Sequence, residues 1–272
     1  MTKIKRFLAY YKPYKKALAA DLFFAGLGSA VVVAYPLLVN KMTTTAIGAN
    51  GIDPVLLVEM IGAFLLLMAV EYGCNYYTDY YGHSLGARME HDMRNDLFRH
   101  VQRLSFKFFD HTATGKLMSR ITNDLFNISE LAHHGPEDLV ISLVRMMGSL
   151  IVLWSINGSL AVTLLLILPF MFLFAYHYSL KVKAALMKSN ERIAALNAQL
   201  EDSLAGIRVT QSFTAEEVEA AKFQDSNQAF LKSRKRGYRA EALFFNGMTS
   251  FMSFMNILVV IVGAILLGNG RL

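Results

Sequence analysis

The residues of this chain whose types could do chemistry are mostly charged side chains placed inside apolar stretches. Glu71 and Asp79 lie in the second apolar stretch, and Arg145 lies in the third. A charge at membrane depth is costly unless it meets a partner or a wet cavity, so such charges commonly mark a transport pathway. We predict that Glu71, Asp79 and Arg145 line a cavity, with structural ion pairing or snorkelling to the interface as the alternative.

A second candidate is the segment Thr114-Gly115-Lys116-Leu117, which has part of the pattern of a phosphate-binding loop. Asp110 stands where the first glycine of that loop belongs. Leu117 stands where a magnesium-binding Ser or Thr is required. The segment therefore does not predict a nucleotide site.

The histidines give a third candidate, the adjacent pair His133 and His134. Neighbouring residues on a helix point apart, and we expect no cysteine or carboxylate to reach this pair at ligand spacing. We interpret the pair as a solvated helix end and predict no metal site. The sequence also contains no Ser/His/Asp or Cys/His pattern that identifies a catalytic residue.

Composition indicates which elements must position these residues. Hydrophobic residues make up 54% of the chain and its mean hydropathy is +0.35, which is typical of a membrane protein. A single cysteine, Cys74, excludes a disulfide framework. The apolar stretches are long enough to cross a hydrocarbon core of ~30 Å as helices. The predicted fold class is therefore an all-α membrane protein, with spans at about 17–42, 55–81, 139–156, 160–180 and 242–267.

The remaining segments are polar and helix-forming. Residues 1–16 alternate basic and aromatic side chains, which predicts an interfacial elbow helix with its aromatics at the membrane boundary. Apolar residues continue at helical spacing into the excursion 82–135, for example at Met89 and Met93, and again into the excursion 181–241. We predict that the second helix runs from Pro54 to Phe109, roughly 80 Å at 1.5 Å per residue, and so projects well beyond the membrane.

Each excursion has a turn signal at its far end, which predicts a short helix lying across the tip. In the first, Asp110 and Thr112 or Thr114 can cap helix starts, and Gly115 can break the helix. In the second, Thr214 is a candidate N-cap, with Glu217 as its capping-box partner three residues later.

The distribution of positive charge predicts the orientation. All but three of the 27 Lys and Arg residues fall in the N-terminal segment and the two excursions, the exceptions being Lys41, Arg145 and Arg271. The positive-inside rule then places the N-terminus and both excursions in the cytoplasm. The charges lie along helix faces with acids between them and without an aromatic stacking platform, so the net charge of +6 does not indicate a nucleic-acid partner.

Two segments resemble the transmembrane domain of a type I ABC exporter. Residues 104–124, with Phe108-Phe109-Asp110, Thr114-Gly115 and Ser119-Arg120-Ile121-Thr122-Asn123-Asp124, are similar to the family's segment around the first coupling helix. Residues 201–213, with Gly206-Ile207-Arg208 and Ser212-Phe213, are similar to the segment that leads to the second. The resemblance extends over essentially the whole chain and identifies residues 17–272 as this domain.

The resemblance implies a half-transporter that works as a dimer of two identical copies in the bacterial cytoplasmic membrane.

 In the family, coupling helices seat on nucleotide-binding domains, which bind ATP and Mg²⁺ and whose closure switches the cavity between inward- and outward-facing. Carried over residue by residue, the first coupling helix comprises His111, Thr112, Ala113, Thr114, Gly115, Lys116 and Leu117. The second comprises Phe213, Thr214, Ala215, Glu216, Glu217, Val218 and Glu219.

The chain departs from the family pattern in two respects. It has five predicted spans where the family has six, and it has no Walker A, signature or Walker B motif. We therefore expect this chain alone to have no ATPase activity, and we expect the sequence to be truncated before a sixth span and the nucleotide-binding domain.

The function predicted on this basis is ATP-driven export of an amphipathic lipid, drug or peptide by a homodimer embedded in the bilayer. One alternative is a carrier driven by an ion gradient, with Glu71, Asp79 and Arg145 as coupling groups. That class predicts inverted repeats and broken midplane helices, which the sequence does not show. The other alternative is a membrane-anchored interaction module, which would not need a polar cavity.

Overall fold

The computed structural model describes residues 3–48 and 51–269, but not the side chains of residues 3–4, 45–48, 51–52 and 116. The ends of the predicted segments 1–16 and 17–272, with Arg271, therefore lie outside the described residues. The chain divides into two compact units, residues 1–155 and residues 156–272, and each is described by itself.

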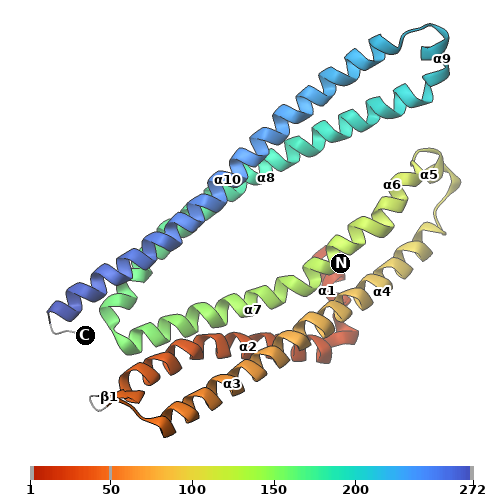
Figure 1. Cartoon of the computed structure of the whole chain (residues 1–272). Coiled ribbons are helices and arrows are strands. Elements are labelled where there is room, and N and C mark those ends of the chain that lie inside the picture. The colour runs from red at the N-terminus through yellow and green to blue at the C-terminus, as the bar shows by residue number, and fades with distance from the viewer. Residues whose placement is uncertain (1–2, 49–50, 270–272) are drawn as a thin grey trace. The chain divides into compact units, whose positions relative to one another are not determined.

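The first unit is built from three long helical rods preceded by a short N-terminal elbow (Figure 1). The elbow consists of α1 (Lys3–Ala9) and the 3-10 turn η1 (Lys12–Tyr14). The first rod is α2 (Lys15–Lys41), followed by the π-helical turn η2 (Met42–Ala46) and a ladder of two-residue strands, β1 (Ile47–Gly48) and β2 (Gly51–Ile52). The second rod joins α3 (Pro54–Tyr77), the π-helical turn η3 (Thr78–Gly82) and α4 (His83–Val101). The short helix α5 (Phe106–Asp110) leads to the third rod, which joins α6 (Thr114–Ser119), the π-helical turn η4 (Arg120–Asp124) and α7 (Leu125–Ile156).

Local signals explain where the second rod begins. The Asp53 carboxylate accepts hydrogen bonds from the backbone N–H groups of Val55 (2.9 Å) and Leu56 (3.4 Å). Pro54 follows at the first helical position, where the missing N–H costs nothing and the fixed φ suits a helix. The turn-rich loop before Pro54 therefore ends in a well-defined helix start.

Small residues allow the rods of the first unit to approach closely. A Cβ on Gly28 of α2 would lie 3.1 Å from the Cβ of Cys74 in α3. A Cβ on Gly148 of α7 would lie 3.1 Å from a methyl of Val33 in α2. Within a bilayer, helices associate through this kind of close packing rather than through the hydrophobic effect.

The polar ends of the rods have an apolar core of their own. Leu85, Met89 and Met93 of α4 pack with Leu125 and Ala132 of α7, and all five side chains are buried. The predicted apolar stripe at Met89 and Met93 is thus confirmed as a core face. The stripe ends earlier than predicted, because the helix that begins at Pro54 ends at Val101 rather than at Phe109.

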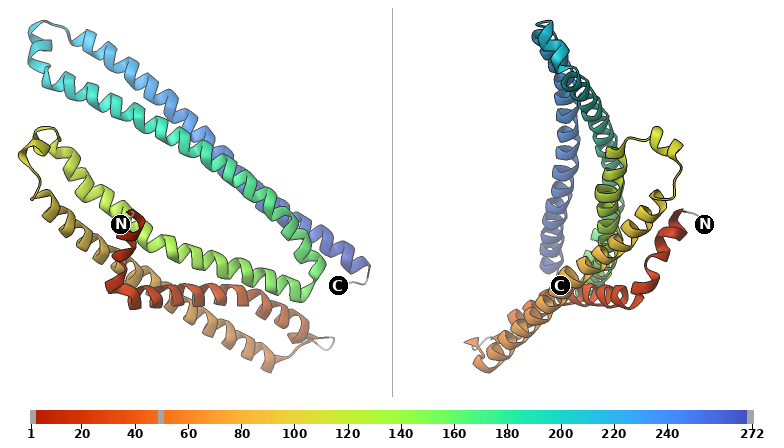
Figure 2. Two further views of the ribbon diagram at one scale, coloured as in Figure 1. Left: turned by 180° about the vertical axis from the view of Figure 1, so that it is seen from behind. Right: turned by 90° about the vertical axis from the view of Figure 1, so that its right-hand side faces the viewer.

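The second unit is a long antiparallel helical hairpin. Its arms are α8 (Gly158–Ala205) and α10 (Glu216–Gly268), and the short helix α9 (Ile207–Ser212) forms the turn between them (Figure 2). Asn157 starts α8 by accepting hydrogen bonds from Ser159 N–H and Leu160 N–H. Farther along, a Cβ on Gly247 of α10 would overlap the ring of Phe174 of α8, so glycine is needed for the two arms to meet there.

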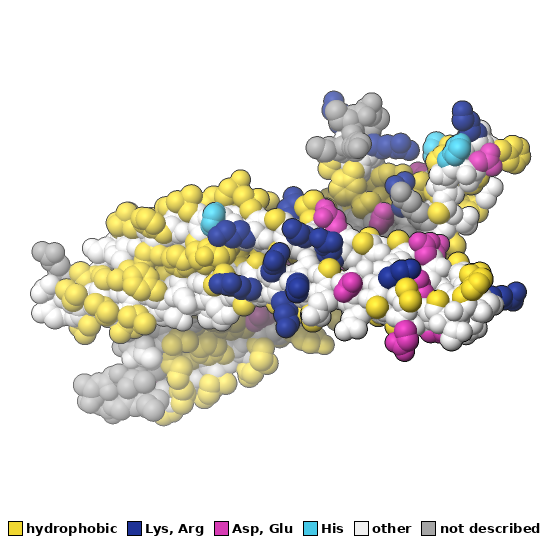
Figure 3. Space-filling view, turned by 90° about the horizontal axis from the view of Figure 1, so that it is seen from above, with side chains coloured by type: hydrophobic (Ala, Val, Ile, Leu, Met, Phe, Trp, Pro, Cys, Tyr) yellow, Lys and Arg dark blue, Asp and Glu magenta, His cyan; other side chains and the backbone are white. Residues whose placement is uncertain are grey.

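The helices are long and apolar enough to span a membrane and to extend beyond it. Five helical segments of the described residues have this property: Lys5–Thr44, Pro54–Val101, Leu117–Ile156, Gly158–Ala205 and Glu216–Gly268. On α8 and α10, hydrophobic side chains cover one part of the hairpin, and Lys and Arg side chains gather next to it (Figure 3). The predicted all-α membrane fold is therefore confirmed.

Candidate functional site

The elbow is attached to the polar ends of the rods by tyrosine hydroxyls. Tyr10 donates a hydrogen bond to Asp96 (2.9 Å), and Tyr14 donates one to Asp92 (2.8 Å), both carboxylates being on α4. Burial raises the pKa of Tyr10 and the bond to Asp96 raises it further. The hydrogen bond to Asp92 is the main cause that raises the pKa of Tyr14.

A third tyrosine extends this attachment to the other rod. Tyr11 donates a hydrogen bond of 2.7 Å to the backbone oxygen of Ala132 in α7. Phe7, Tyr10, Tyr11 and Tyr14 also pack against the core between α4 and α7. The elbow aromatics were predicted to lie at the membrane boundary, and that depth stays a prediction. The structure adds that these four side chains pack on α4 and α7.

The first tip, residues 102–119, carries the segment predicted as the first coupling helix. The short helix of this tip is α5, Phe106–Asp110, so it precedes the predicted segment His111–Leu117. The reason is the extended backbone of Ser105 (φ −72°, ψ 156°), which ends the preceding turn and starts a new helix at Phe106. His111, Thr112 and Ala113 form the connection, and Thr114–Leu117 form the first turn of α6.

The first tip presents one strongly exposed aromatic ring and encloses a small apolar pocket. Phe106 is 90% exposed. The ends of α4, α5, α6 and η4 form a pocket of about 220 Å³ whose lining includes Leu97, Val101, Phe108 and Ile121. Arg94 Nε donates a hydrogen bond of 3.3 Å to the backbone oxygen of Ile121, which ties α4 to η4. The tip is therefore held by both rods.

The second tip, residues 206–215, differs from the predicted second coupling helix in the same way. Its short helix is α9, Ile207–Ser212, and the predicted segment Phe213–Glu219 begins where α9 ends. The predicted capping box of Thr214 and Glu217 is wrong. Thr214 has φ +50°, a left-handed conformation that a β-branched residue rarely adopts, and Ala215 occupies the N-cap position of α10 without a side-chain hydrogen bond.

The second tip is instead secured between the two arms of the hairpin. Ser203 of α8 donates a hydrogen bond of 2.7 Å to Glu219 of α10, and Lys222 donates one of 2.6 Å to the same carboxylate. The bonds from Lys222 and from Ser203 lower the pKa of the Glu219 carboxyl. Phe213 remains 79% exposed at the end of the hairpin. The tip is therefore a fixed surface with an apolar side chain at its end.

The three predicted cavity residues have different environments. Glu71 accepts a hydrogen bond of 2.6 Å from the Tyr35 hydroxyl, which links α3 to α2. Asp79 and Arg145 are exposed, and within the described part of the chain neither side chain makes a hydrogen bond or an ion pair. The structure thus gives Glu71 a polar partner and does not bring the three charges together.

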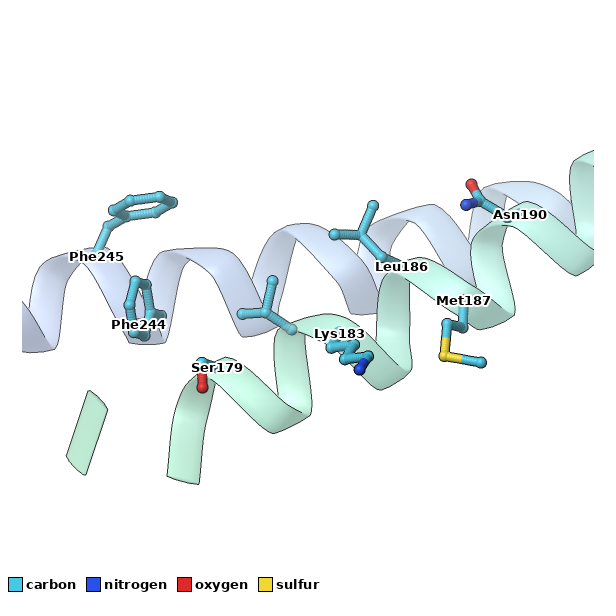
Figure 4. Close-up of a pocket in the computed structure, with 8 residues that line it drawn as sticks. Ser179, Lys183, Leu186, Met187, Asn190, Phe244 and Phe245 are labelled. Carbon is cyan, nitrogen blue, oxygen red and sulfur yellow. The ribbon is translucent and has the colours of Figure 1, made fainter. Parts of the chain in front are cut away.

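A separate pocket lies between the arms of the hairpin (Figure 4). Its volume is about 340 Å³. The α8 side contributes Ser179, Lys183 and Asn190 together with apolar side chains, and the α10 side contributes Phe244 and Phe245. The lining is thus mostly apolar with a few polar groups, which suits an amphipathic molecule.

A buried polar cluster, which the sequence interpretation missed, lies where the three rods of the first unit meet. We call it the histidine cluster: Asp21 of α2, His83 of α4, and His133, His134 and Glu137 of α7. His133 is 2% exposed, and its Nδ1 lies 3.7 Å from Asp21 Oδ2 while its Nε2 lies 3.3 Å from Glu137 Oε2.

The structure therefore corrects the interpretation of the adjacent histidines as a solvated helix end. The rings of His133 and His134 lie 4.6 Å apart instead of pointing away from each other, and His133 is buried. Carboxylates are within reach at helical spacing: Glu137 follows His133 by four residues, and Glu130 precedes His134 by four. That i,i+4 spacing was the available signal. The contribution of Asp21 had no signal beyond a charge in an apolar stretch.

Comparisons with known proteins agree with this architecture. A family model described as the ABC transporter transmembrane region matches residues 18–272. The uncharacterized ABC transporter ATP-binding protein YwjA of Bacillus subtilis is 36% identical over 271 residues, which are 99% of this chain and 46% of that protein. YknV of the same organism, also an uncharacterized ABC transporter ATP-binding protein, is 32% identical over 88% of this chain and 40% of its own length.

A third relative has a name that refers to export. The putative multidrug export ATP-binding/permease protein YgaD of Bacillus subtilis is 22% identical over 100% of this chain and 48% of that protein. The chain thus spans less than half the length of these relatives. With a family model over residues 18–272 and five helices able to span a membrane, the chain belongs to the ABC transporter transmembrane region family, as an integral membrane domain with the all-α fold of a type I exporter.

Proposed function

We propose that this chain is the membrane-spanning part of an ATP-driven exporter of amphipathic substrates such as a lipid, a drug or a peptide. The observation that carries the proposal is the pair of tips at the ends of long continuous helices. Each tip has a short helix, and each presents an exposed aromatic side chain, Phe106 in the first and Phe213 in the second. Exposed rings on a rigid support are suited to docking on another domain.

The partners at the tips are nucleotide-binding domains. Their closure on ATP and Mg²⁺ supplies the free energy, and the residues of this chain do not themselves fit a nucleotide, since Asp110 and Leu117 replace two required residues of a phosphate loop. The tips receive the closing movement, and the rods carry it to the membrane. The Ser203–Glu219 and Arg94–Ile121 hydrogen bonds keep each tip fixed to its helices, so a displacement at the tip moves the helices with it.

The substrate pathway of this proposal runs along the membrane-facing helices. The pocket between α8 and α10 combines two phenylalanines with Ser179, Lys183 and Asn190, and the Tyr35–Glu71 pair places a polar group at membrane depth in the first unit. Both features fit a substrate with apolar and polar parts. A second copy of the chain completes the cavity. The Lys and Arg distribution supports an orientation with the N-terminus and both tips in the cytoplasm of a bacterial cell.

The membrane-depth charges distinguish this function from its alternatives. In an exporter, Glu71→Gln and Arg145→Gln change which substrates are transported and with what apparent affinity, by severalfold, while ATP-dependent transport persists. The matched control is Glu59→Gln, an exposed carboxylate in the same helix α3. The measurement is competition between several lipophilic dyes for ATP-dependent uptake by vesicles that contain the full-length protein.

The other classes predict different results from the same variants. An ion-coupled carrier would be indicated by two results together. Glu71→Gln would lose all transport, and an imposed ion gradient would drive uptake by the unaltered protein but not by this variant. Unchanged handling of every dye in both variants would remove these residues from the pathway and favour the interaction module.

A further inference from the structure

The histidine cluster contains more buried polar atoms than its hydrogen bonds satisfy. Both carboxylate oxygens of Asp21, both ring nitrogens of His133 and Oε2 of Glu137 are buried and have no hydrogen-bond partner among the described residues. Asp21 is 1% exposed and Glu137 is 9% exposed. Buried carboxylates are costly without a compensating positive charge, which here must come from a protonated His133 or from a bound cation.

The backbone of the second rod is shaped to admit this cluster. Gly82 lies at the end of the π-helical turn η3, and a Cβ there would overlap Cε1 of His133 and lie 2.7 Å from Asp21 Oδ1. Gly82 has ordinary helical angles (φ −66°, ψ −50°), so the position needs glycine for space and not for backbone freedom. The missing side chain at Gly82 thus leaves the space in which the His133 ring and the Asp21 carboxylate meet.

Three imidazoles converge at the same place. One ring nitrogen from each of His83, His133 and His134 lies within 4.8 Å of the others. Imidazole nitrogens bound to one tetrahedral Zn²⁺ at about 2.0–2.1 Å are roughly 3.3 Å apart. Small side-chain rotations close this difference, because His83 is exposed and His134 is half-buried, which leaves both rings room to turn toward the buried ring of His133.

The hydrogen-bond partners leave suitable nitrogens available for an ion. Nδ1 of His83 lies 2.6 Å from the backbone oxygen of Asp79, which can only accept, so that nitrogen carries the proton and Nε2 is left as a ligand. Nε2 of His134 faces Glu130 at 3.5 Å, which leaves Nδ1. Either nitrogen of His133 can bind, because the other then faces a carboxylate. Metal-ligating histidines commonly have their second nitrogen held in this way.

We propose that the histidine cluster is a site for a divalent transition-metal ion of the Zn²⁺ or Co²⁺ class, bound by His83, His133 and His134. Imidazole ligands favour these ions over Mg²⁺ and Ca²⁺, which prefer oxygen. Asp21 and Glu137 flank His133, and their two negative charges are balanced by the charge of the ion. The ion joins α4 to α7, next to the Tyr11 bond that attaches the elbow to Ala132.

The test uses the full-length protein, purified in detergent without a histidine tag and stripped with a chelator. Co²⁺ is added and its visible absorption is recorded, because a tetrahedral site with nitrogen ligands gives an intense band, and Zn²⁺ is then used as the competitor. We expect one Co²⁺ per chain, displaced by Zn²⁺, and a thermal unfolding midpoint that rises when either ion is bound.

Variants of the two ligands that are not buried, His83 and His134, test the assignment without emptying a buried position. His83→Ala and His134→Ala should each weaken Co²⁺ binding at least tenfold, while the control His91→Ala, an exposed histidine of the same helix α4, should leave it unchanged. Asp21→Asn should weaken binding by about 10- to 100-fold, as expected for a partner of a ligand. The proposal is overturned if the unaltered protein shows no saturable Co²⁺ band, or if the double variant His83→Ala/His134→Ala binds Co²⁺ as well as the unaltered protein does.

Discussion

Gly82→Ala should be one of the most destabilising single-methyl additions in this chain, lowering the free energy of unfolding by about 2 kcal/mol. The added Cβ would overlap the His133 ring and crowd Asp21, and both of those side chains are buried. His133 cannot retreat easily, because its ring lies between Asp21 and Glu137 and against the ring of His83. The measurement is unfolding of the purified protein in detergent, followed by helical circular dichroism as a denaturant is added.

The matched control is Gly73→Ala, in the same helical rod. A Cβ on Gly73 meets no described atom within 4 Å, so alanine there gains helix propensity without a clash. We expect this variant to be as stable as the unaltered protein or slightly more stable. Equal stability of the two variants would show that the close approach of His133 to the second rod does not exist.

Phe213→Ala should lower ATP-dependent transport by about tenfold or more while leaving the protein folded. The ring is 79% exposed at the end of the hairpin, so its removal costs little stability, but it removes the largest apolar contact that the second tip can offer a partner. The measurement is transport by the full-length protein in vesicles, together with the ATPase rate and its response to substrate.

The control for this variant is Leu231→Ala, an exposed apolar residue of α10 away from the tip. Its transport should match that of the unaltered protein. If Phe213→Ala transports normally and its ATPase activity responds to substrate as before, then the second tip is not the surface that couples the nucleotide-binding domains to the membrane-spanning helices.

The sequence was sufficient to predict the five spanning helices and their continuation beyond the membrane. Apolar length predicted the spans, and the spacing of Met89 and Met93 predicted a core face outside the apolar region, because both signals are repeated over many residues. The short helices at the tips were displaced by several residues. Their limits depend on the backbone at single positions, the extended Ser105 and the left-handed Thr214, and neither conformation has a signal in the sequence.

The histidine cluster was beyond sequence reasoning for a different reason. Its members come from α2, α4 and α7, and their meeting depends on the space left at Gly82. The spacing of His133 and Glu137 indicates only that the two can interact on one helix. Nothing in the order of residues shows that Asp21 belongs to the cluster, because its contact with His133 follows from the packing of α2 against α7.

The most direct test of the proposed function is the energy source of transport by the full-length protein reconstituted in vesicles. Uptake of a lipophilic dye is recorded with ATP and Mg²⁺ outside, with a non-hydrolysable ATP analogue, and with an imposed proton or sodium gradient without nucleotide. We predict that uptake requires hydrolysable ATP and persists when ionophores remove every ion gradient. Uptake driven by an ion gradient in the absence of ATP would contradict the assignment of this chain to an ATP-driven exporter.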